Sequence, residues 1–464
     1  MTATLTAPRS GPSGRGARGT LETFDIGHAT HVALIDADAA FWAVVPRARV
    51  AEVLAGGSLL AEHQAKRGEL LREMDVLRFG LQPSCVYFNP TERCNLDCSY
   101  CYIPSSMRKG GRHMTPAEVL AALAKLDERF RATLPAGRLP QVIFHGAEPL
   151  LNREAIFPAI AKYAERFRFG VQTNATLLDD CAIAFLVEHG VGIGLSLDGP
   201  DAGISDRTRS TWGGASAHAG VASAIERLRG YARYSVICTI TRENVEHLSG
   251  VVDYLHEREV PACMLNVVRC TLPGARALSA TDDEVVPHYL AALERSHEHF
   301  ARTGRKLVVV NFANVLLAIL APTARRLMCD VSPCGGGRSF FAVATNGDLF
   351  PCSEFIGLPA FRGGNLFHDD LDDVLTSRAF RAVTERKVED IEACRDCAVR
   401  HFCGAPCPAE AFEMNGGMDR IGGYCRFYLE QARFAFRLIA EARAEDFLWD
   451  GWSEGTSVTF GQVP

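Results

Sequence analysis

Three cysteines, Cys94, Cys98 and Cys101, lie in one short segment, separated by three and then by two residues. A [4Fe–4S] cluster is usually held by four thiolates, so a loop that offers three would leave one iron free to bind a molecule from outside the protein. Two other interpretations are a structural zinc site, which usually takes four ligands with C-x2-C pairs, and buried core thiols. The odd number and the spacing favour an iron–sulfur cluster with one reactive iron.

A second group of cysteines lies towards the end of the chain, at Cys329, Cys334, Cys352, Cys394, Cys397, Cys403, Cys407 and Cys425. Sixteen cysteines without a secretory signal indicate a reducing compartment in which thiolates bind metal, and we expect a cytoplasmic protein. A pair of zinc ribbons is the alternative, because C-x2-C followed by C-x3-C is acceptable zinc spacing. The five remaining cysteines stand alone and are expected to be buried thiols: Cys85, Cys181, Cys238, Cys263 and Cys270.

Composition excludes several classes of partner. The 464 residues are 47% hydrophobic and 22% charged, as in ordinary globular proteins. A net charge of −6 gives no basic surface for nucleic acid. We find no run of about 18 apolar residues and therefore expect no membrane span.

The elements that must position these cysteines alternate between strand and helix from residue 83 to 312. Helical patterns at 116–133, 155–166, 180–188 and 245–257 separate most of the strands. This alternation predicts an α/β fold with a parallel sheet covered by helices. The apolar runs that predict its strands are 85–89, 141–144, 169–172, 191–197, 234–239, 263–268 and 307–311.

Four further segments flank this region. Residues 1–20 are rich in Gly, Ser and Pro and are expected to form a disordered tail. Residues 21–82 predict a β-hairpin followed by helices. Residues 313–430 hold the second group of cysteines, and 431–464 are expected to form a C-terminal helix and tail.

The cysteine loop, with the aromatic Tyr100 just before its last cysteine, resembles the signature loop of radical S-adenosylmethionine (radical SAM) enzymes. The resemblance implies a partial (β/α)6 TIM-like barrel over 83–312, with ligands at the carboxyl ends of its strands. It implies that Cys94, Cys98 and Cys101 hold the cluster that chelates S-adenosylmethionine. The other residues that it implies for binding this cofactor are Tyr100, Gly146, Ala147, Glu148, Asn174, Ser196 and Asp198.

Two segments also resemble motifs of this family. Residues 144–150 (FHGAEPL) resemble its Gly-Gly-Glu-Pro segment, in which Glu148 would meet the amino group of S-adenosylmethionine. Ala147 replaces the second glycine, and its methyl group is tolerated if φ stays negative. Residues 206–209 (DRTR) resemble an element in which an arginine, here Arg209, approaches the substrate or the cofactor carboxylate.

The second cysteine group resembles the SPASM domain, which has seven cysteines and carries auxiliary [4Fe–4S] clusters. Cys329 supplies an eighth thiolate, and eight thiolates can ligate two clusters fully. The family pattern assigns Cys329, Cys334, Cys352 and Cys407 to the first auxiliary cluster. It assigns Cys394, Cys397, Cys403 and Cys425 to the second, which makes three [4Fe–4S] clusters in all.

SPASM domains are typical of enzymes that modify ribosomally made peptides, so the resemblance implies a precursor peptide as substrate. It implies a 5′-deoxyadenosyl radical that abstracts a hydrogen atom, and an electron donor such as a flavodoxin or a ferredoxin. The 21–82 segment resembles part of a leader-peptide-binding winged helix, or it is a plain cap on the barrel.

Three functions are compatible with these motifs. We favour an oxidative thioether or carbon–carbon crosslink in the peptide. The alternative is formylglycine formation as in anaerobic sulfatase maturases, whose aspartate after the cysteine matching Cys352 is replaced here by Ser353 and then Glu354. Glu354 is therefore a candidate base or a mere surface acid. A protein that only transfers electrons or senses iron–sulfur chemistry is the non-enzymatic alternative.

Overall fold

The computed structural model describes residues 21–403 and 407–453. The predicted tail at 1–20 and the end of the 431–464 segment lie outside these residues. One ten-stranded sheet, in the order β10-β9-β8-β7-β6-β5-β4-β11-β12-β13, runs through the molecule. Its strands are β4 (Cys85–Phe88), β5 (Gln141–Phe144), β6 (Arg168–Thr173), β7 (Gly192–Ser196), β8 (Tyr234–Ile240), β9 (Ala262–Val267), β10 (Val308–Val309), β11 (Phe340–Val343), β12 (Asp348–Phe350) and β13 (Gly364–Asn365).

Strands β4 to β10 are parallel and follow one another in the sheet, which confirms the predicted α/β architecture. Burial alternates along β8 and β9, as expected where one side chain in two faces the barrel interior. The helices of this region are α3 (Ser105–Gly110), α4 (Pro116–Thr133), α5 (Arg153–Tyr163), α6 (Asp180–Glu188), α7 (Ala202–Ser205), α8 (His218–Arg227), α9 (Leu248–Glu257), α10 (Pro273–Leu278) and α11 (Asp282–Thr303).

Helix boundaries follow local sequence signals. At the start of α4, Thr115 accepts a hydrogen bond from the backbone of Glu118, whose carboxylate accepts one from the backbone of Thr115. This capping box and Pro116 at the first helical position fix the predicted start. The predicted strand at 307–311 is wrong in part, because helix α12 (Val310–Leu320) begins after only two strand residues.

The auxiliary-cysteine region is joined to the barrel by backbone hydrogen bonds. Strand β11 pairs in parallel with β4, in the register Phe340↔Cys85 to Val343↔Phe88. It also pairs with β12 in an antiparallel hairpin, and Gly347 in the intervening turn has φ +83°, which favours glycine. The first barrel strand therefore lies between a barrel strand and a strand of the cysteine-rich region.

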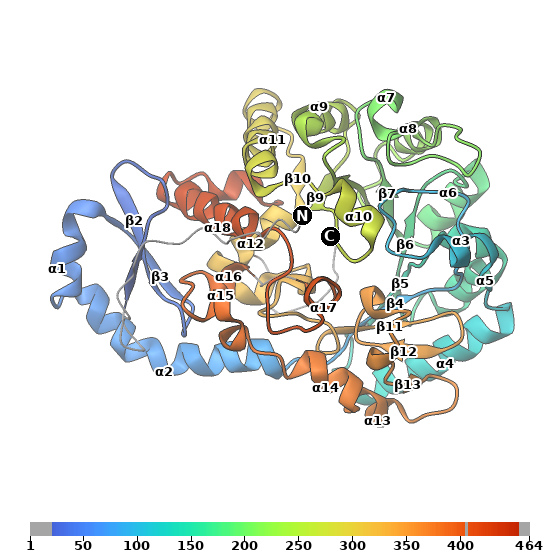
Figure 1. Ribbon diagram of the computed structural model, residues 1–464, viewed down its shortest axis with the longest axis horizontal. Coiled ribbons are helices and arrows are strands. Elements are labelled where there is room, and N and C mark those ends of the chain that lie inside the picture. Colours follow the sequence, from blue (N-terminus) through green and yellow to red (C-terminus); the bar gives the residue numbers. More distant parts are fainter. Residues whose placement is uncertain (1–20, 404–406, 454–464) are drawn as a thin grey trace.

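The N-terminal segment forms a separate sheet at one end of the molecule (Figure 1). Strands β1 (Glu22–Phe24), β2 (His31–Asp36) and β3 (Phe41–Pro46) are antiparallel, and α1 (Val50–Leu54) and α2 (Ser58–Phe79) follow. The hairpin and helices were predicted, whereas β1 was not. Trp42 Nε1 donates a hydrogen bond of 2.8 Å to Ile319 O, so this sheet is anchored to α12.

Short helices fill the C-terminal region between the N-terminal sheet and the barrel (Figure 1). Helix α12 crosses the predicted boundary at 312 and α18 crosses that at 430, so the proposed domain limits do not coincide with helix ends. Within 21–403 and 407–453 no helix is long and apolar enough to cross a membrane. The helices here are α13 (Leu371–Leu375), α14 (Arg378–Thr384), α15 (Glu392–Arg395), α16 (Arg400–Cys403), α17 (Pro408–Asn415) and α18 (Cys425–Ala440).

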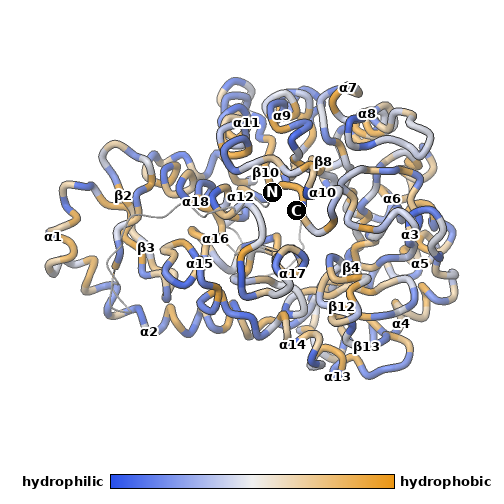
Figure 2. Tube along the Cα trace, viewed as in Figure 1, coloured by the Kyte–Doolittle hydropathy of each residue, from blue (hydrophilic) through white to orange (hydrophobic). Residues whose placement is uncertain are grey.

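The core lies between the sheet and its covering helices. Hydrophilic and hydrophobic residues alternate along α11 and α18 (Figure 2), and the apolar residues of both helices are buried in the same cluster as the barrel strands. Of the five solitary cysteines, Cys85, Cys238, Cys263 and Cys270 are buried as predicted. Cys181 is exposed because it lies on the outer face of α6.

Candidate active site

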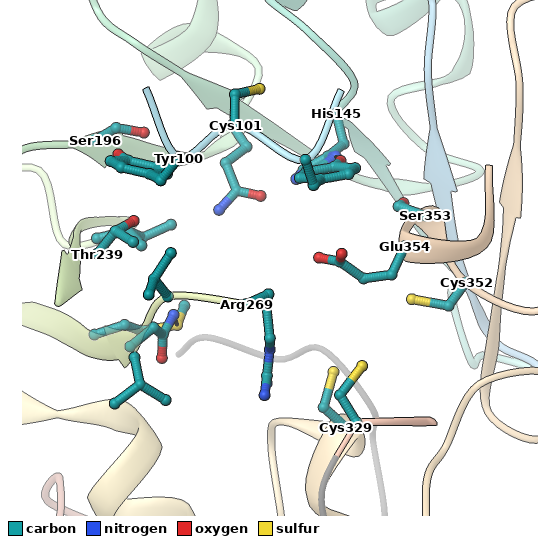
Figure 3. A pocket seen from close by; sticks show the side chains of 18 of the residues that line it. Tyr100, Cys101, His145, Ser196, Thr239, Arg269, Cys329, Cys352, Ser353 and Glu354 are labelled. Atoms are coloured by element: carbon teal, nitrogen blue, oxygen red, sulfur yellow. Dashed lines mark hydrogen bonds between the residues drawn. The ribbon is translucent and has the colours of Figure 1, made fainter. Parts of the chain in front are cut away.

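A cavity of about 440 Å³ lies at the carboxyl ends of the barrel strands and extends to the auxiliary cysteines. The cysteine loop lines one side, and Cys329 and Cys352 lie on the other (Figure 3). Seven of the predicted functional residues outside the cysteines line it: Tyr100, Gly146, Ala147, Asn174, Ser196, Arg209 and Glu354. Residues from distant parts of the sequence therefore share one chamber.

The cysteine loop is held in place by backbone hydrogen bonds to two neighbouring segments. Cys94 N donates to Arg108 O at 3.0 Å. Asp97 N donates to Ser210 O at 2.8 Å. These two bonds fix the loop to the segments that contain Arg108 and Ser210.

Arg108 and Trp212 also support the loop, and neither was predicted from the sequence. Arg108 Nη1 donates to Leu96 O at 3.1 Å and pairs with Asp97 Oδ1 at the same distance. Its guanidinium lies 5.0 Å from the centre of the Trp212 ring, and Trp212 Nε1 donates to Cys94 O at 2.9 Å. These contacts join residues far apart in the chain, and no local motif marks them.

The three thiols of the loop have the surroundings expected of cluster ligands. Burial raises the pKa of Cys94 to about 12 and that of Cys101 to about 11, so these thiols need a bound cation to ionise. Leu96 N and Asn174 Nδ2 donate to Cys94 Sγ at 3.4 and 3.7 Å. Such donors suit a thiolate bound to iron.

Among the residues that the structure describes, no three His, Cys, Asp or Glu side chains are arranged to hold one metal ion. A cluster makes a different demand, because each thiolate binds its own iron and the sulfur atoms stay apart. One buried and two partly buried thiols around one end of a cavity meet that demand. The donor set therefore fits a cluster in the loop.

Gly146 and Ala147 form the cavity wall at the end of β5. Gly146 has φ +106°, and a Cβ there would lie 2.9 Å from Asn89 Cγ, so only glycine fits. Ala147 does not have a positive φ. Its methyl group is therefore tolerated at the position of the family's second glycine.

Glu148 lies behind this wall and is fully buried. Its carboxylate accepts hydrogen bonds from Thr173 Oγ1 and Asn174 N, both at 2.8 Å, and from Leu150 N at 3.1 Å. Burial raises its pKa, and the bonds from Asn174 and Thr173 act in the opposite direction. In this structure Glu148 therefore joins the ends of β5 and β6.

Tyr100, Asp198 and Arg209 form a hydrogen-bonded group at the mouth of the barrel. Tyr100 OH donates to Asp198 Oδ2 at 2.6 Å, and Arg209 Nη1 donates to Tyr100 OH at 2.5 Å. Burial raises the pKa of Asp198, while Arg209 and the Tyr100 hydroxyl act to lower it. Asp198 is fully buried, whereas Tyr100 and Arg209 face the cavity.

Asn174 and Ser196 follow β6 and end β7, and both side chains reach the cavity. Asn174 Nδ2 donates to Asn95 Oδ1 at 2.8 Å. Asn95 Nδ2 in turn donates to Thr176 Oγ1 at 2.8 Å. These amides tie the cysteine loop to the end of β6.

The four cysteines predicted for the first auxiliary cluster come together. Cys329, Cys334, Cys352 and Cys407 all line the cavity. Burial raises the pKa of Cys352 well above its usual range, and the neighbouring Cys329, Glu354, Cys334 and Cys407 add to the effect.

The structure groups three of the four cysteines predicted for the second auxiliary cluster. Burial raises the pKa of Cys394 to about 12, and the nearby Cys397 and Cys425 contribute. Cys403 ends α16 and lines the cavity. It immediately precedes 404–406, which lie outside the described residues.

Glu354 points into the cavity between His145 and Arg269, towards the side that carries Tyr100 and Cys101 (Figure 3). Its Oε2 is buried and has no hydrogen-bond partner among the residues that the structure describes. Burial raises the pKa of this carboxyl to about 7, with Arg269 acting to lower it. Glu354 is thus a cavity residue rather than a surface acid.

Comparison with protein families identifies the two regions. Residues 88–255 match the radical SAM superfamily, and residues 334–398 match the SPASM iron–sulfur cluster-binding domain. An uncharacterized protein of Archaeoglobus fulgidus is 38% identical over 408 residues, which is 88% of this chain and 92% of that protein. The chain belongs to the radical SAM superfamily. It is a radical SAM enzyme with a SPASM domain, which rules out the purely electron-transferring or sensing alternative.

Named relatives are more distant. The cysteine-type anaerobic sulfatase-maturating enzyme of Clostridium perfringens is 24% identical, with 75% of this chain and 94% of that enzyme covered. The solved structure of anSMEcpe with bound AdoMet superimposes with a TM-score of 0.68 at 21% identity, covering 80% of this chain and 97% of the other. Streptococcus suis SuiB bound to its precursor peptide SuiA gives 0.55 at 13% identity, covering 78% and 80%. These structures share the fold.

Membership of this superfamily supplies the cofactors: S-adenosylmethionine and [4Fe–4S] clusters, whose cysteines are present in this chain.

Proposed function

We propose that this radical SAM enzyme oxidises a residue of a ribosomally made precursor peptide by two electrons, forming a thioether or carbon–carbon crosslink. The observation that carries the proposal is the shared cavity, in which Glu354 presents a carboxylate oxygen without a partner among the described residues. A carboxylate in that position can take the proton that the substrate must lose.

The proposal gives each group of residues a task. When bound at Cys94, Cys98 and Cys101, the cluster and S-adenosylmethionine supply the radical that abstracts a hydrogen atom. Asn174, Ser196 and Arg209 would orient the cofactor and the peptide at the strand ends. After this abstraction the substrate radical would give one electron to an auxiliary cluster held by the second cysteine group and one proton to Glu354. The product therefore has two hydrogens fewer than the substrate. A flavodoxin or a ferredoxin would supply the starting electron.

The experiment uses reconstituted enzyme and candidate precursor peptides chosen from short open reading frames that neighbour its gene. We expect a product lighter by two hydrogens that does not react with hydrazide. Glu354→Gln should still cleave S-adenosylmethionine but should lose the product, because the amide cannot accept the proton. Glu392→Gln, an exposed glutamate on α15, is the matched control. Full product formation by Glu354→Gln would contradict the role of Glu354.

Formylglycine formation is the second candidate, because several relatives are named anaerobic sulfatase-maturating enzymes. Ser353 occupies the position of their aspartate, its side chain is buried, and it cannot serve as that base at neutral pH. A product that reacts with hydrazide would establish this second function and would contradict crosslinking.

A further inference from the structure

An ion pair connects the N-terminal sheet to the second auxiliary-cysteine group across 362 residues of sequence. Arg400 Nη2 donates to Asp38 Oδ1 in the turn between β2 and β3. Arg400 Nη1 donates to Cys397 O at 3.3 Å. One guanidinium therefore contacts a predicted cluster ligand and a carboxylate of the N-terminal segment. In Figure 1, α15 and α16 lie next to β3.

The Asp38 carboxylate is itself fixed from the other side. Arg67 Nη2 on α2 pairs with Asp38 Oδ2 at 3.4 Å, and Arg67 Nε pairs with Asp36 Oδ2 at 2.8 Å. His63 Nε2 lies 2.8 Å from the same Asp36 oxygen. Asp38 is thus held between two arginines from different elements.

Burial makes the charge of Arg400 effective at the cysteines. Its side chain is 8% exposed and that of Asp38 is 29% exposed, so solvent screens the pair incompletely. Arg400 Nη1 lies 3.3 Å from the backbone oxygen of Cys397, so its positive charge is held beside a predicted ligand of the second auxiliary cluster. A cluster bound at that ligand would be subject to the field of this charge.

We propose that Arg400 and Asp38 are positioning residues that set the reduction potential of the cluster at Cys394, Cys397, Cys403 and Cys425. The proposal rests on the ligand assignment within the proposed function. Reduction adds negative charge to a cluster, so a nearby cation favours the reduced state and a nearby anion opposes it. Arg400 therefore raises the potential, and Asp38 lowers it by neutralising part of that charge.

This arrangement has a consequence for the oxidation. The second electron of the substrate must leave through the auxiliary region, and the potential there decides how readily that electron is accepted. A residue of the N-terminal sheet consequently contributes to a step whose chemistry takes place in the barrel mouth. That contribution gives the 21–82 segment a role other than a plain cap.

The test is a redox titration followed by electron paramagnetic resonance, in enzyme whose Cys94, Cys98 and Cys101 are replaced by Ala. The signal that is lost on adding Cys394→Ala and Cys397→Ala identifies the second auxiliary cluster. Arg400→Gln should shift its midpoint potential downwards, and Asp38→Asn should shift it upwards. Shifts in opposite directions distinguish charge from a loosened structure, which would move both variants the same way.

Two control variants complete the experiment. Asp25→Asn breaks an exposed ion pair with Arg47 just outside the strands of the same sheet and should leave the potential unchanged. Arg400→Lys keeps the positive charge, so its cluster potential should be closer to the wild-type value than that of Arg400→Gln. If Arg400→Gln cannot assemble the cluster, the sign of the shift in Asp38→Asn tests the proposal by itself.

An unchanged potential in Asp38→Asn, a downward shift in that variant, or failure of the cysteine variants to remove a signal would overturn the proposal. The outcome is separate from that of the peptide reaction, because the potentials are measured without peptide. Absence of a crosslinked product would contradict the proposed function and leave these shifts as expected.

Discussion

The hydroxyl of Tyr100 donates a 2.6 Å hydrogen bond to Asp198 across 98 residues of sequence. Tyr100 belongs to the cysteine loop after the first barrel strand, and Asp198 follows β7 on the opposite part of the barrel mouth. Arg209 donates to the same hydroxyl. Replacing one member of this buried group should therefore disturb the loop and the arginine together.

Asp198→Asn should lower the free energy of unfolding by about 3 kcal/mol, because it leaves a buried guanidinium without its ion-pair partner. Asp198 Oδ2 lies 3.8 Å from Arg209 Nη1. Chemical unfolding of the anaerobic protein measures the change. Asp180→Asn, which removes an exposed partner of Arg227, should change stability by less than about 0.5 kcal/mol. Equal stability of the two variants would show that the group is unimportant.

Glu148→Gln should affect stability as well as cofactor binding. The carboxylate accepts bonds from three donors on two elements, so the amide NH₂ of Gln would face at least one donor. We expect a loss of about 1–3 kcal/mol in unfolding free energy, together with weaker S-adenosylmethionine binding. Calorimetric titration and unfolding of the same preparation measure both. Thr173→Val removes one donor and should have a smaller effect on each quantity.

Replacing Cys94, Cys98 and Cys101 together by Ala should remove about four of about twelve irons per chain, since three cubic clusters are expected. Cleavage of S-adenosylmethionine should be abolished while the auxiliary clusters remain. Iron analysis and detection of 5′-deoxyadenosine measure the two results. Two zinc ions and about four irons in the intact protein would instead support the zinc-ribbon alternative for the auxiliary cysteines.

Cys394→Ala combined with Cys397→Ala should separate the two halves of the reaction. The barrel site is intact in this variant, so S-adenosylmethionine should still be cleaved when peptide is present. The crosslinked product should be lost, because the second auxiliary cluster is no longer present to take the substrate's second electron onward. Mass spectrometry of the peptide shows whether the crosslinked product forms. Cys181→Ala, at an exposed position outside the cavity, serves as the control. Normal crosslinking by the double variant would contradict a role for the second auxiliary cluster.

The sequence predicted those parts of the protein that local signals specify. Helix α4 is found at its predicted bounds because Thr115, Pro116 and Glu118 mark its start. The turn between β11 and β12 has a local signal of the same kind, because glycine readily adopts the positive φ found at Gly347. By contrast, 307–320 is an apolar run without a clear period, so the change from strand to helix at Val310 has no local marker.

The parts of the site that could not be predicted are long-range contacts. Trp212 lies 118 residues from the Cys94 carbonyl that it contacts, and nothing near Trp212 in the sequence indicates that partner. Arg400 and Asp38 are farther apart still. Glu148 was predicted as a cofactor ligand from its motif, but its hydrogen bonds to the end of β6 depend on the register of neighbouring strands. Such features follow from the tertiary structure alone.

The parallel pairing of β11 with β4 bears on how this protein can be divided. A truncated chain that ended after the barrel would leave the hydrogen-bonding groups of Cys85 to Phe88 exposed along one edge. The remaining fragment would likewise present Phe340 to Val343 as an open, apolar strand, because all four residues are buried in the intact protein. Open edges of this kind recruit other chains. Separate expression of either fragment should therefore yield aggregates, and co-expression of the two should restore a paired, dispersed complex.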